Sequence, residues 1–292
     1  AEELIIAGLR QLYWMNSGEG KLAAFPWKYQ IQGMNTMSNK TLKDIEERIK
    51  DLEIDDVLDY LYSLKAESCN GIDRLISKYE KKKENMAKEL ARLDAMCAFE
   101  KDAYEKGYRF IAGIDEAGRG PLAGPVVAAA IILPENVCIF GLNDSKKLTS
   151  KQRESLYDEI IEKAVAFSVG IADEKQIDSV NILNATKAAM EKAVSSLKPQ
   201  PDILFIDAVK LENVKIKQVP IVKGDSKSVS IAAASIVAKV TRDRLIDELD
   251  QVYPQYGFKN HKGYGTKEHI EAIKKYGICP IHRISFTKKF TL

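Results

Sequence analysis

The sequence predicts an α/β domain with a central sheet, preceded by a small helical extension. From about residue 106 onward, short apolar stretches alternate with longer stretches of helical periodicity, the pattern of strands joined by helices. Before that point, apolar residues recur only at helical spacing. The chain has 292 residues, 45% of them hydrophobic and 29% charged, which is enough to bury a sizeable core. We expect three parts, over residues 1–37, 38–105 and 106–292.

The first two parts differ in character. Residues 1–37 have no clear period, and Met34 and Met37 both suit a natural start, so we expect a disordered leader or an addition foreign to the natural chain. Residues 38–105 carry narrow apolar stripes and runs of charge, which are typical of solvated helices; a nucleic-acid contact is the alternative. Helices are expected there over about residues 42–52, 57–64 and 72–97.

The α/β domain is expected to alternate strands and helices without an internal repeat. Apolar segments predict strands over residues 109–115, 125–133, 165–172, 203–207 and 219–222. Helices are expected from Ser150, over about residues 182–197, from Ser226 towards Leu249, and from Gly265 to about Tyr276, before a basic tail.

Composition excludes some classes of protein. No apolar run approaches the roughly 20 residues of a membrane span. Four cysteines lie far apart without metal-binding spacing, which favours reduced thiols in a cytoplasmic protein and gives no support for zinc. They are Cys69, Cys97, Cys138 and Cys279. We expect a monomer in the cytoplasm, with no membrane partner.

Charge is unevenly distributed along the chain. The formal net charge is +2, but residues 208–292 contain 16 Lys and Arg against 8 Asp and Glu, while the rest carries a net charge of −6. A basic C-terminal third suits a polyanionic partner such as nucleic acid, although an ordinary solvated surface explains the charge equally well.

Two adjacent carboxylates, Asp115 and Glu116, follow a buried strand and precede a glycine-rich turn at residues 118–124. Burying two acids at the end of a strand is costly unless a cation is bound there, although Asp-Glu before Gly is also ordinary loop composition.

The same segment offers an alternative, because Gly113 and Gly118 have the glycine spacing of a P-loop. That interpretation fails, because Arg119 and Gly120 replace the required Lys and Ser or Thr, and the acids would repel a phosphate.

Further acids stand at matching places. Asp207 ends an apolar strand, and Asp225 precedes the Ala-rich helix, where it could simply cap that helix. Four carboxylates converging on one edge of a sheet would suit two divalent cations, which stabilise the attacking and leaving oxygens of phosphodiester hydrolysis. Together with the basic third of the chain, this pattern predicts a nuclease.

The signature over residues 113–127 resembles that of bacterial type 2 ribonuclease H, ribonuclease HII. Arg119 favours type 2, because the related type 3 enzyme lacks an arginine at this place. The region before residue 105 resembles the N-terminal extension of some Gram-positive members. Supporting motifs follow in the family's order, at residues 144–148, 205–207, 223–225, 230–243 and 262–266.

The resemblance implies a ribonuclease H-like domain with a mixed sheet flanked by helices. It also implies that Asp115, Glu116, Asp207 and Asp225 are the catalytic residues and ligate Mg²⁺ or Mn²⁺. Asp243 matches a family position as well, but its setting between two arginines predicts a helical ion pair instead of a metal ligand.

The same resemblance implies a substrate-binding surface. Gly118, Arg119 and Gly120 would read the ribose 2′-hydroxyl largely through the backbone, the group that distinguishes RNA from DNA. Tyr264 would stack on the following sugar, although without the resemblance it is a loop aromatic. Lys146 and Lys147 would touch phosphate, although alone they form only a basic loop.

The implied activity is cleavage of the RNA strand of RNA–DNA hybrids and nicking of duplex DNA 5′ to an embedded ribonucleotide. The implied chemistry is two-metal hydrolysis that leaves a 3′-hydroxyl and a 5′-phosphate. One rival is a nucleic-acid-binding protein without catalysis, which would gain nothing from the four acids. Another is an adaptor that binds a replication clamp through residues 284–290, where Phe286 and Phe290 lie but the usual glutamine is missing.

Overall fold

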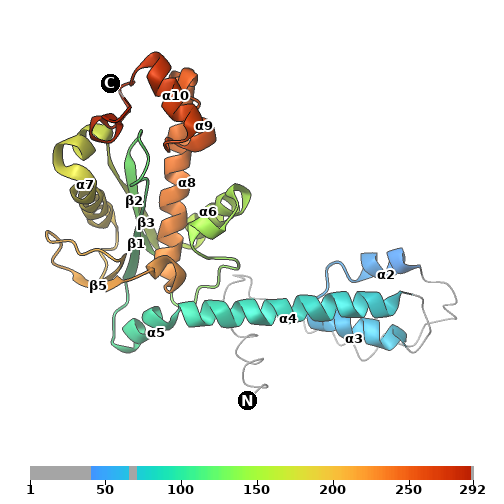
Figure 1. Ribbon diagram of the computed structural model, residues 1–292. Coiled ribbons are helices and arrows are strands. Elements are labelled where there is room, and N and C mark those ends of the chain that lie inside the picture. The colour runs from blue at the N-terminus through green and yellow to red at the C-terminus, as the bar shows by residue number, and fades with distance from the viewer. Residues whose placement is uncertain (1–40, 66–70, 291–292) are drawn as a thin grey trace. The chain divides into compact units, whose positions relative to one another are not determined.

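The computed structural model describes residues 41–65 and 71–290 (Figure 1). The chain divides into two compact units, an N-terminal unit up to Lys88 and a C-terminal unit from Glu89. The leader expected over residues 1–37 lies outside the described residues. None of the described helices is both long and apolar enough to cross a membrane.

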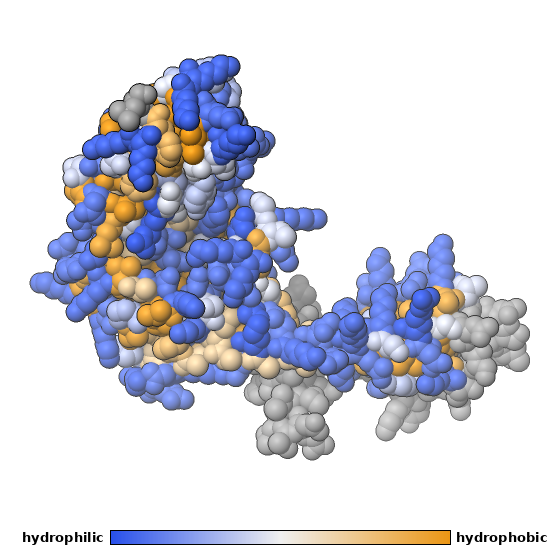
Figure 2. Space-filling view, in the orientation of Figure 1, coloured by the Kyte–Doolittle hydropathy of each residue, from blue (hydrophilic) through white to orange (hydrophobic). Residues whose placement is uncertain are grey.

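The N-terminal unit is a small helical bundle of α2 (Leu42–Arg48), α3 (Ile54–Lys65) and the first part of α4 (Ile72–Met96). Thr41 caps α2 through a capping box with Asp44. The helices meet through residues at helical spacing, and the surface along α4 is mainly hydrophilic (Figure 2). The residues buried in this bundle are Ile45, Ile49, Val57, Leu58, Leu61, Leu64, Ile72, Leu75 and Ile76.

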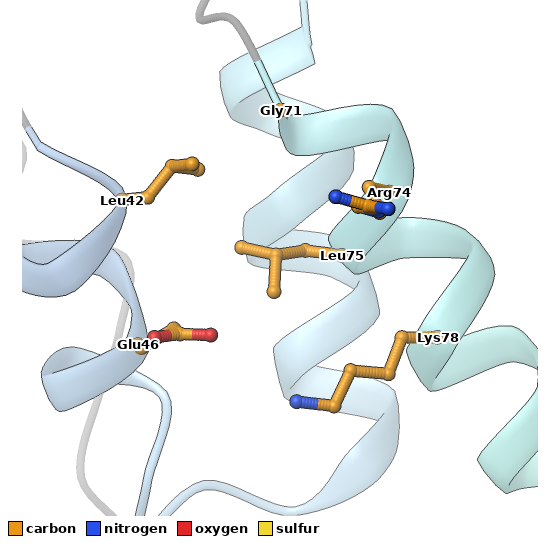
Figure 3. A pocket seen from close by; sticks show the side chains of 6 residues that line it. All are labelled: Leu42, Glu46, Gly71, Arg74, Leu75 and Lys78. Atoms are coloured by element: carbon orange, nitrogen blue, oxygen red, sulfur yellow. The ribbon is translucent and has the colours of Figure 1, made fainter.

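A pocket of about 480 Å³ lies between α2 and α4 in this unit. Figure 3 shows that Leu75 points from α4 toward α2, between the side chains of Leu42 and Glu46. None of the residues expected to form a functional site lines this pocket.

The C-terminal unit is built on a mixed five-stranded sheet in the order β3-β2-β1-β4-β5. The strand β1 pairs antiparallel with β2 and parallel with β4, while β3 and β5 form the edges. All five strands coincide with expected ones to within about two residues. They are β1 (Ile111–Ala117), β2 (Val126–Ile132), β3 (Ala166–Ala172), β4 (Ile203–Asp207) and β5 (Lys217–Ile221).

Helices cover both faces of this sheet, as the fold class predicts. In Figure 1, α7 (Glu174–Ser196) lies on one face and α8 (Val229–Val252) on the other. Strand residues alternate between the two apolar clusters beneath these helices. At Gly113 a Cβ atom would lie only 2.0 Å from the backbone of Ser230 in α8. Glycine on β1 therefore lets α8 lie directly against the strand that carries the paired acids.

Shorter helices complete the unit. The 3₁₀ turn η2 (Ser145–Lys147) and α6 (Ser150–Lys163) follow β2, and η3 (Gly224–Ser226) follows β5. Beyond α8 the chain forms η4 (Pro254–Tyr256), α9 (Phe258–His261), α10 (Lys267–Tyr276) and α11 (Ile284–Thr287).

The helix α5 (Ala98–Glu105) belongs to the C-terminal unit. Its Ala103 and Tyr104 pack against Ile111 of β1 and Phe205 of β4. By its contacts, the C-terminal unit thus includes residues 89–105, the last part of the expected extension.

Two helix starts differ from expectation. The helix α7 begins at Glu174, with Asp173 as its N-cap, instead of near Ile182; a kink at Asn181 (φ 69°) interrupts its periodicity. The helix α8 begins at Val229 with Ser228 as its N-cap, so Asp225 lies in η3 and does not cap α8.

Candidate active site

Asp115 and Asp207 are neighbours on the two central parallel strands. β1 and β4 pair with Ile114 opposite Ile206, so the next residues, Asp115 and Asp207, are also level. Side chains alternate between the two faces of a sheet, so Asp207 lies on the same face as Phe205, two residues earlier. Phe205 packs on the face that α8 covers. Neighbouring strands lie about 4.8 Å apart, so both carboxylates stand close together on this face.

Glu116 and Asp225 complete the group, which we call the carboxylate cluster: Asp115, Glu116, Asp207 and Asp225. Each member has a polar partner of its own. The contacts are Asp115 Oδ1 with the Glu116 N–H (2.7 Å), Glu116 Oε1 with Arg119 Nη1 (3.3 Å), Asp207 Oδ1 with the Gly224 N–H (2.9 Å), and Asp225 Oδ2 with Lys146 Nζ (3.5 Å).

Burial and mutual repulsion disfavour negative charge in the cluster. Loss of water raises the pKa of the buried Asp115 well above its usual range, and the charges of Glu116 and Asp207 add to the effect. Burial likewise raises the pKa of Glu116, against the opposing effect of Arg119. The pKa of Asp225 is raised by burial and then by Asp144. A bound cation would relieve this cost.

The cluster suits a hard divalent cation in the chemistry of its donors, since all of them are carboxylate oxygens. In residues 41–65 and 71–290, however, no three His, Cys, Asp or Glu side chains are grouped so that they could hold one metal ion. Each carboxylate instead contacts a polar group of the chain.

The glycine loop, residues 118–124, begins directly after β1. Gly118 adopts φ +97°, and a Cβ atom there would lie 2.1 Å from Arg242 Nε, so no other residue fits without a shift. Arg119 and Gly120 are exposed, and a Cβ on Gly120 would lie 3.5 Å from the Tyr264 ring. The expected substrate-binding residues of this loop therefore lie beside Tyr264 and next to the carboxylate cluster.

Two buried arginines hold the glycine loop, and sequence reasoning missed both. Arg283 donates hydrogen bonds of 2.6–3.0 Å to the carbonyl oxygens of Gly118, Arg119, Pro121 and Gly124. Arg242 donates to Ala123, Pro125 and Lys262 in the same way. Both side chains are almost wholly buried. A basic tail and an Arg-Asp-Arg run gave no sign that these arginines point inward.

Tyr264 has an exposed side chain, and its backbone contacts a cluster of three histidines. The Tyr264 carbonyl oxygen is 2.8 Å from His269 Nδ1, and His269 Nε2 is 3.1 Å from His282 Nε2. His261 stacks on His269 with ring centroids 4.5 Å apart. All three histidines of the chain thus lie behind the loop that carries Tyr264.

The remaining candidates are placed as follows. Lys146 reaches Asp225, whereas Lys147 is exposed and forms no ion pair with any described residue. Asp243 pairs with Lys239 at 2.6 Å and with Arg153 at 4.0 Å, so it forms the expected ion pair, although not with its neighbours in sequence. Cys97, Cys138 and Cys279 form no disulfide; Cys69 lies outside the described residues.

Solved structures define the class of this unit. The ribonuclease H2 of Pyrococcus horikoshii OT3 is 30% identical with a TM-score of 0.52, over 62% of this chain and 96% of that one. A ribonuclease HII of Archaeoglobus fulgidus, solved in complex with PCNA, is 28% identical with a TM-score of 0.51, over 61% and 94% of the two chains. The C-terminal unit therefore has a ribonuclease H-like fold, as the sequence predicted.

The particular family follows from the sequence comparisons. The family model for ribonuclease HII matches residues 112–289, and the model for the ribonuclease HII N-terminal domain matches residues 41–104. The chain belongs to the ribonuclease HII family, and it is a metal-dependent nuclease that acts on RNA–DNA substrates.

Bacterial relatives match both parts of the chain. The ribonuclease HII of Acetivibrio thermocellus is 65% identical over 254 residues, which is 87% of this chain and 99% of the relative. The ribonuclease HII of Clostridioides difficile is 52% identical over 252 residues, 86% and 99% of the two chains.

Proposed function

We propose that this chain cleaves the RNA strand of RNA–DNA hybrids and nicks duplex DNA 5′ to an embedded ribonucleotide. The products are a 3′-hydroxyl and a 5′-phosphate. The observation that supports this proposal is the placement of the carboxylate cluster directly beside the glycine loop. That placement brings carboxylate oxygens, which are the donors that a divalent cation prefers, next to backbone groups that a sugar can approach closely.

In the proposed mechanism, the carboxylate cluster holds Mg²⁺ or Mn²⁺. Two such ions, when bound, supply an activated water and stabilise the charge on the attacking and leaving oxygens. Asp115 and Asp207 provide donors from adjacent strands, and Asp225 provides one from η3. Lys146 and Arg119 lie at the rim, where their positive charges offset the repulsion between the cluster and a phosphate.

Substrate recognition is proposed for the surrounding loops. Gly118, Arg119 and Gly120 bring the backbone within reach of a ribose 2′-hydroxyl. Arg283 fixes the carbonyl oxygens of Gly118 and Arg119. Tyr264, exposed beside Gly120, stacks on the sugar that follows the ribonucleotide. Lys146 and Lys147, both exposed, bind phosphate.

The decisive assay uses a DNA duplex with a single ribonucleotide, incubated with Mg²⁺ or with EDTA. We expect one nick, 5′ to the ribonucleotide and only with Mg²⁺, and a 3′ end that a polymerase extends without prior treatment. Cleavage in EDTA, or a 3′-phosphate product, would contradict the proposed chemistry.

A clamp partner is a secondary proposal. The Archaeoglobus fulgidus relative was solved in complex with PCNA, and the tail of this chain carries two aromatics. Both are engaged here: Phe286 packs on the sheet's core, and Phe290 packs on the cluster around Tyr256. Asp178 accepts hydrogen bonds from the backbone of Ile284 and Ser285. Binding a clamp through this segment would therefore require these contacts to break.

A further inference from the structure

Glu100 is a buried carboxyl group that the mechanism above does not use. It lies on α5, before the part of the chain that the ribonuclease HII model covers. Its side chain is 5% exposed, and burial raises its pKa. Burying a carboxyl group is costly, so the contacts that hold it are informative.

Glu100 Oε1 accepts two hydrogen bonds from the start of α8. The donors are the Ser228 hydroxyl at 2.5 Å and the Ser230 backbone N–H at 3.1 Å. Ser228 is also the N-cap of α8, where its oxygen accepts from the Ile231 N–H. A carboxylate oxygen suits the first turn of a helix, because the N–H groups there have no helical partner. Glu100 Oε2 is buried without a hydrogen-bond partner among the described residues.

The start of α8 is linked in turn to two members of the carboxylate cluster. The Ser228 N–H donates to the Gly224 carbonyl at 2.9 Å, which closes the turn that carries Asp225. The Gly224 N–H donates to Asp207 Oδ1, also at 2.9 Å. A continuous path of hydrogen bonds therefore runs from Glu100 through Ser228 and Gly224 to Asp207.

The helix α5 itself packs on the central strands of the sheet. Phe99 meets Phe205 of β4 edge-on, with ring centroids 6.2 Å apart, and Ala103 is buried beside Ile111. The helix that carries Glu100 thus packs on β1 and β4, the strands that carry Asp115 and Asp207. Through its hydrogen bonds, Glu100 fixes the start of α8, and with it η3, relative to these strands.

We propose that Glu100 is a positioning residue, which sets the start of α8 and thereby the placement of Asp207 and Asp225. This inference rests on the proposed function, because it takes these two acids as metal ligands. It assigns a part in catalysis to a residue of the segment that the N-terminal family model covers.

The test compares the full-length wild type with Glu100→Ala, Glu100→Gln and the control Asp102→Ala. Asp102 is exposed on the same helix, and among the described residues its side chain pairs with Lys106 alone. Each variant is assayed on the single-ribonucleotide duplex for kcat and KM separately, and for Mn²⁺ binding by calorimetry without substrate. Circular dichroism and thermal unfolding check that each variant is folded.

For Glu100→Ala we expect kcat to fall at least about tenfold at saturating substrate and Mg²⁺, the equivalent of about 1.4 kcal/mol. KM should change less than about threefold, and Mn²⁺ should bind several times more weakly. Glu100→Gln retains an acceptor oxygen and should recover most of kcat. Asp102→Ala should match the wild type.

Equal kcat and Mn²⁺ affinity in folded Glu100→Ala and in the wild type would overturn the inference. If Glu100→Ala does not fold, Ser228→Ala tests the same path. It removes the hydroxyl that contacts Glu100 and caps α8, and it should reproduce the loss of kcat. Unchanged kcat would again overturn the inference. Failure of the proposed function looks different, because the wild type itself would then not nick the duplex.

Discussion

Arg283 shows how one buried side chain can shape the glycine loop from far along the chain. Its guanidinium group satisfies carbonyl oxygens of the glycine loop that would otherwise be buried without donors. A planar fork of five N–H groups suits this task, whereas a lysine ammonium has only three donors on a flexible stem. The loop's geometry therefore depends on arginine in particular and not on charge alone.

Arg283→Lys should lower both stability and activity. Several carbonyl oxygens would lose their donors in a buried site, which typically costs about 1–3 kcal/mol each when unrelieved. We expect a clear fall in the free energy of unfolding, measured with urea, and slower nicking of the single-ribonucleotide duplex. Arg109→Lys, an exposed arginine 4.0 Å from Glu135, is the control and should change neither. Wild-type stability in Arg283→Lys would contradict the assigned role.

Tyr264→Ala should selectively harm cleavage at a single embedded ribonucleotide. Losing a stacking contact costs about 1–3 kcal/mol, or roughly ten- to a hundredfold in rate if the contact acts in the transition state. Continuous hybrid offers many registers, so its cleavage should fall less. Rates on the two substrates are compared side by side, with Tyr264→Phe as the control that keeps the ring. Equal losses on both substrates would make Tyr264 a general binding residue.

At the scale of elements, the sequence predicted the strands better than the helix starts. Apolar runs ending in acids located β1 and β4, because buried central strands are continuously hydrophobic. The first turns of α7 were missed, since the kink at Asn181 breaks the helical period. Asp225 and Ser228 both suit a helix start by type, and only the observed backbone shows that Ser228 is the cap.

The supporting residues of the site could not be predicted for a different reason. Arg242, Arg283 and Glu100 are charged types that normally lie on the surface. Apart from the Lys262 carbonyl, which is 20 positions from Arg242, their partners are backbone groups and a serine more than a hundred positions away in the chain. No local pattern therefore reveals them. The carboxylates, by contrast, follow strands whose pairing the α/β pattern already implies.

The histidine cluster behind Tyr264 should make the fold sensitive to acid. Burial lowers the pKa of His269 and of His282 from 6.5 to about 4 in the folded chain. Between about pH 6.5 and 4 the unfolded chain therefore binds more protons, so the free energy of unfolding should fall as pH falls through this window. Acids whose pKa is raised in the folded chain make the free energy of unfolding rise as pH falls. The effect of the histidines is therefore measured as a difference between the wild type and a histidine variant.

His282→Gln isolates this effect, because it removes one of the two shifted groups. Urea unfolding of the wild type and of His282→Gln at pH 7.5, 6 and 5 measures the difference. The wild type should lose more stability than the variant as pH falls, by on the order of 1–3 kcal/mol. Parallel curves for the two proteins would mean that His282 does not titrate differently on unfolding.

At the scale of the whole molecule, the N-terminal unit should contribute to substrate binding and not to chemistry. Arg74, Lys78, Lys81 and Lys82 on α4 form no ion pair with any described residue, which leaves them available for phosphate. A chain that begins at Glu89 keeps the carboxylate cluster, the glycine loop and Glu100. We expect its KM to rise, with a weaker dependence on salt, while kcat stays within about twofold of the full chain.

Deletion of residues 1–37 alone is the matched control, and it should leave KM and kcat unchanged. A folded chain from Glu89 that lost turnover at saturating substrate would contradict this division of roles.

The central claim is that the carboxylate cluster performs metal-dependent hydrolysis, and Asp115→Asn tests it most directly. Asp115 is buried, and its pKa is raised by burial and by neighbouring acids, so an amide of the same shape should not destabilise the fold. The measurement is nicking of the single-ribonucleotide duplex in Mg²⁺ by wild type, Asp115→Asn and the exposed control Asp158→Asn. We predict that Asp115→Asn slows cleavage at least about a hundredfold while duplex binding stays within about threefold. Cleavage by Asp115→Asn at near the wild-type rate would contradict the account.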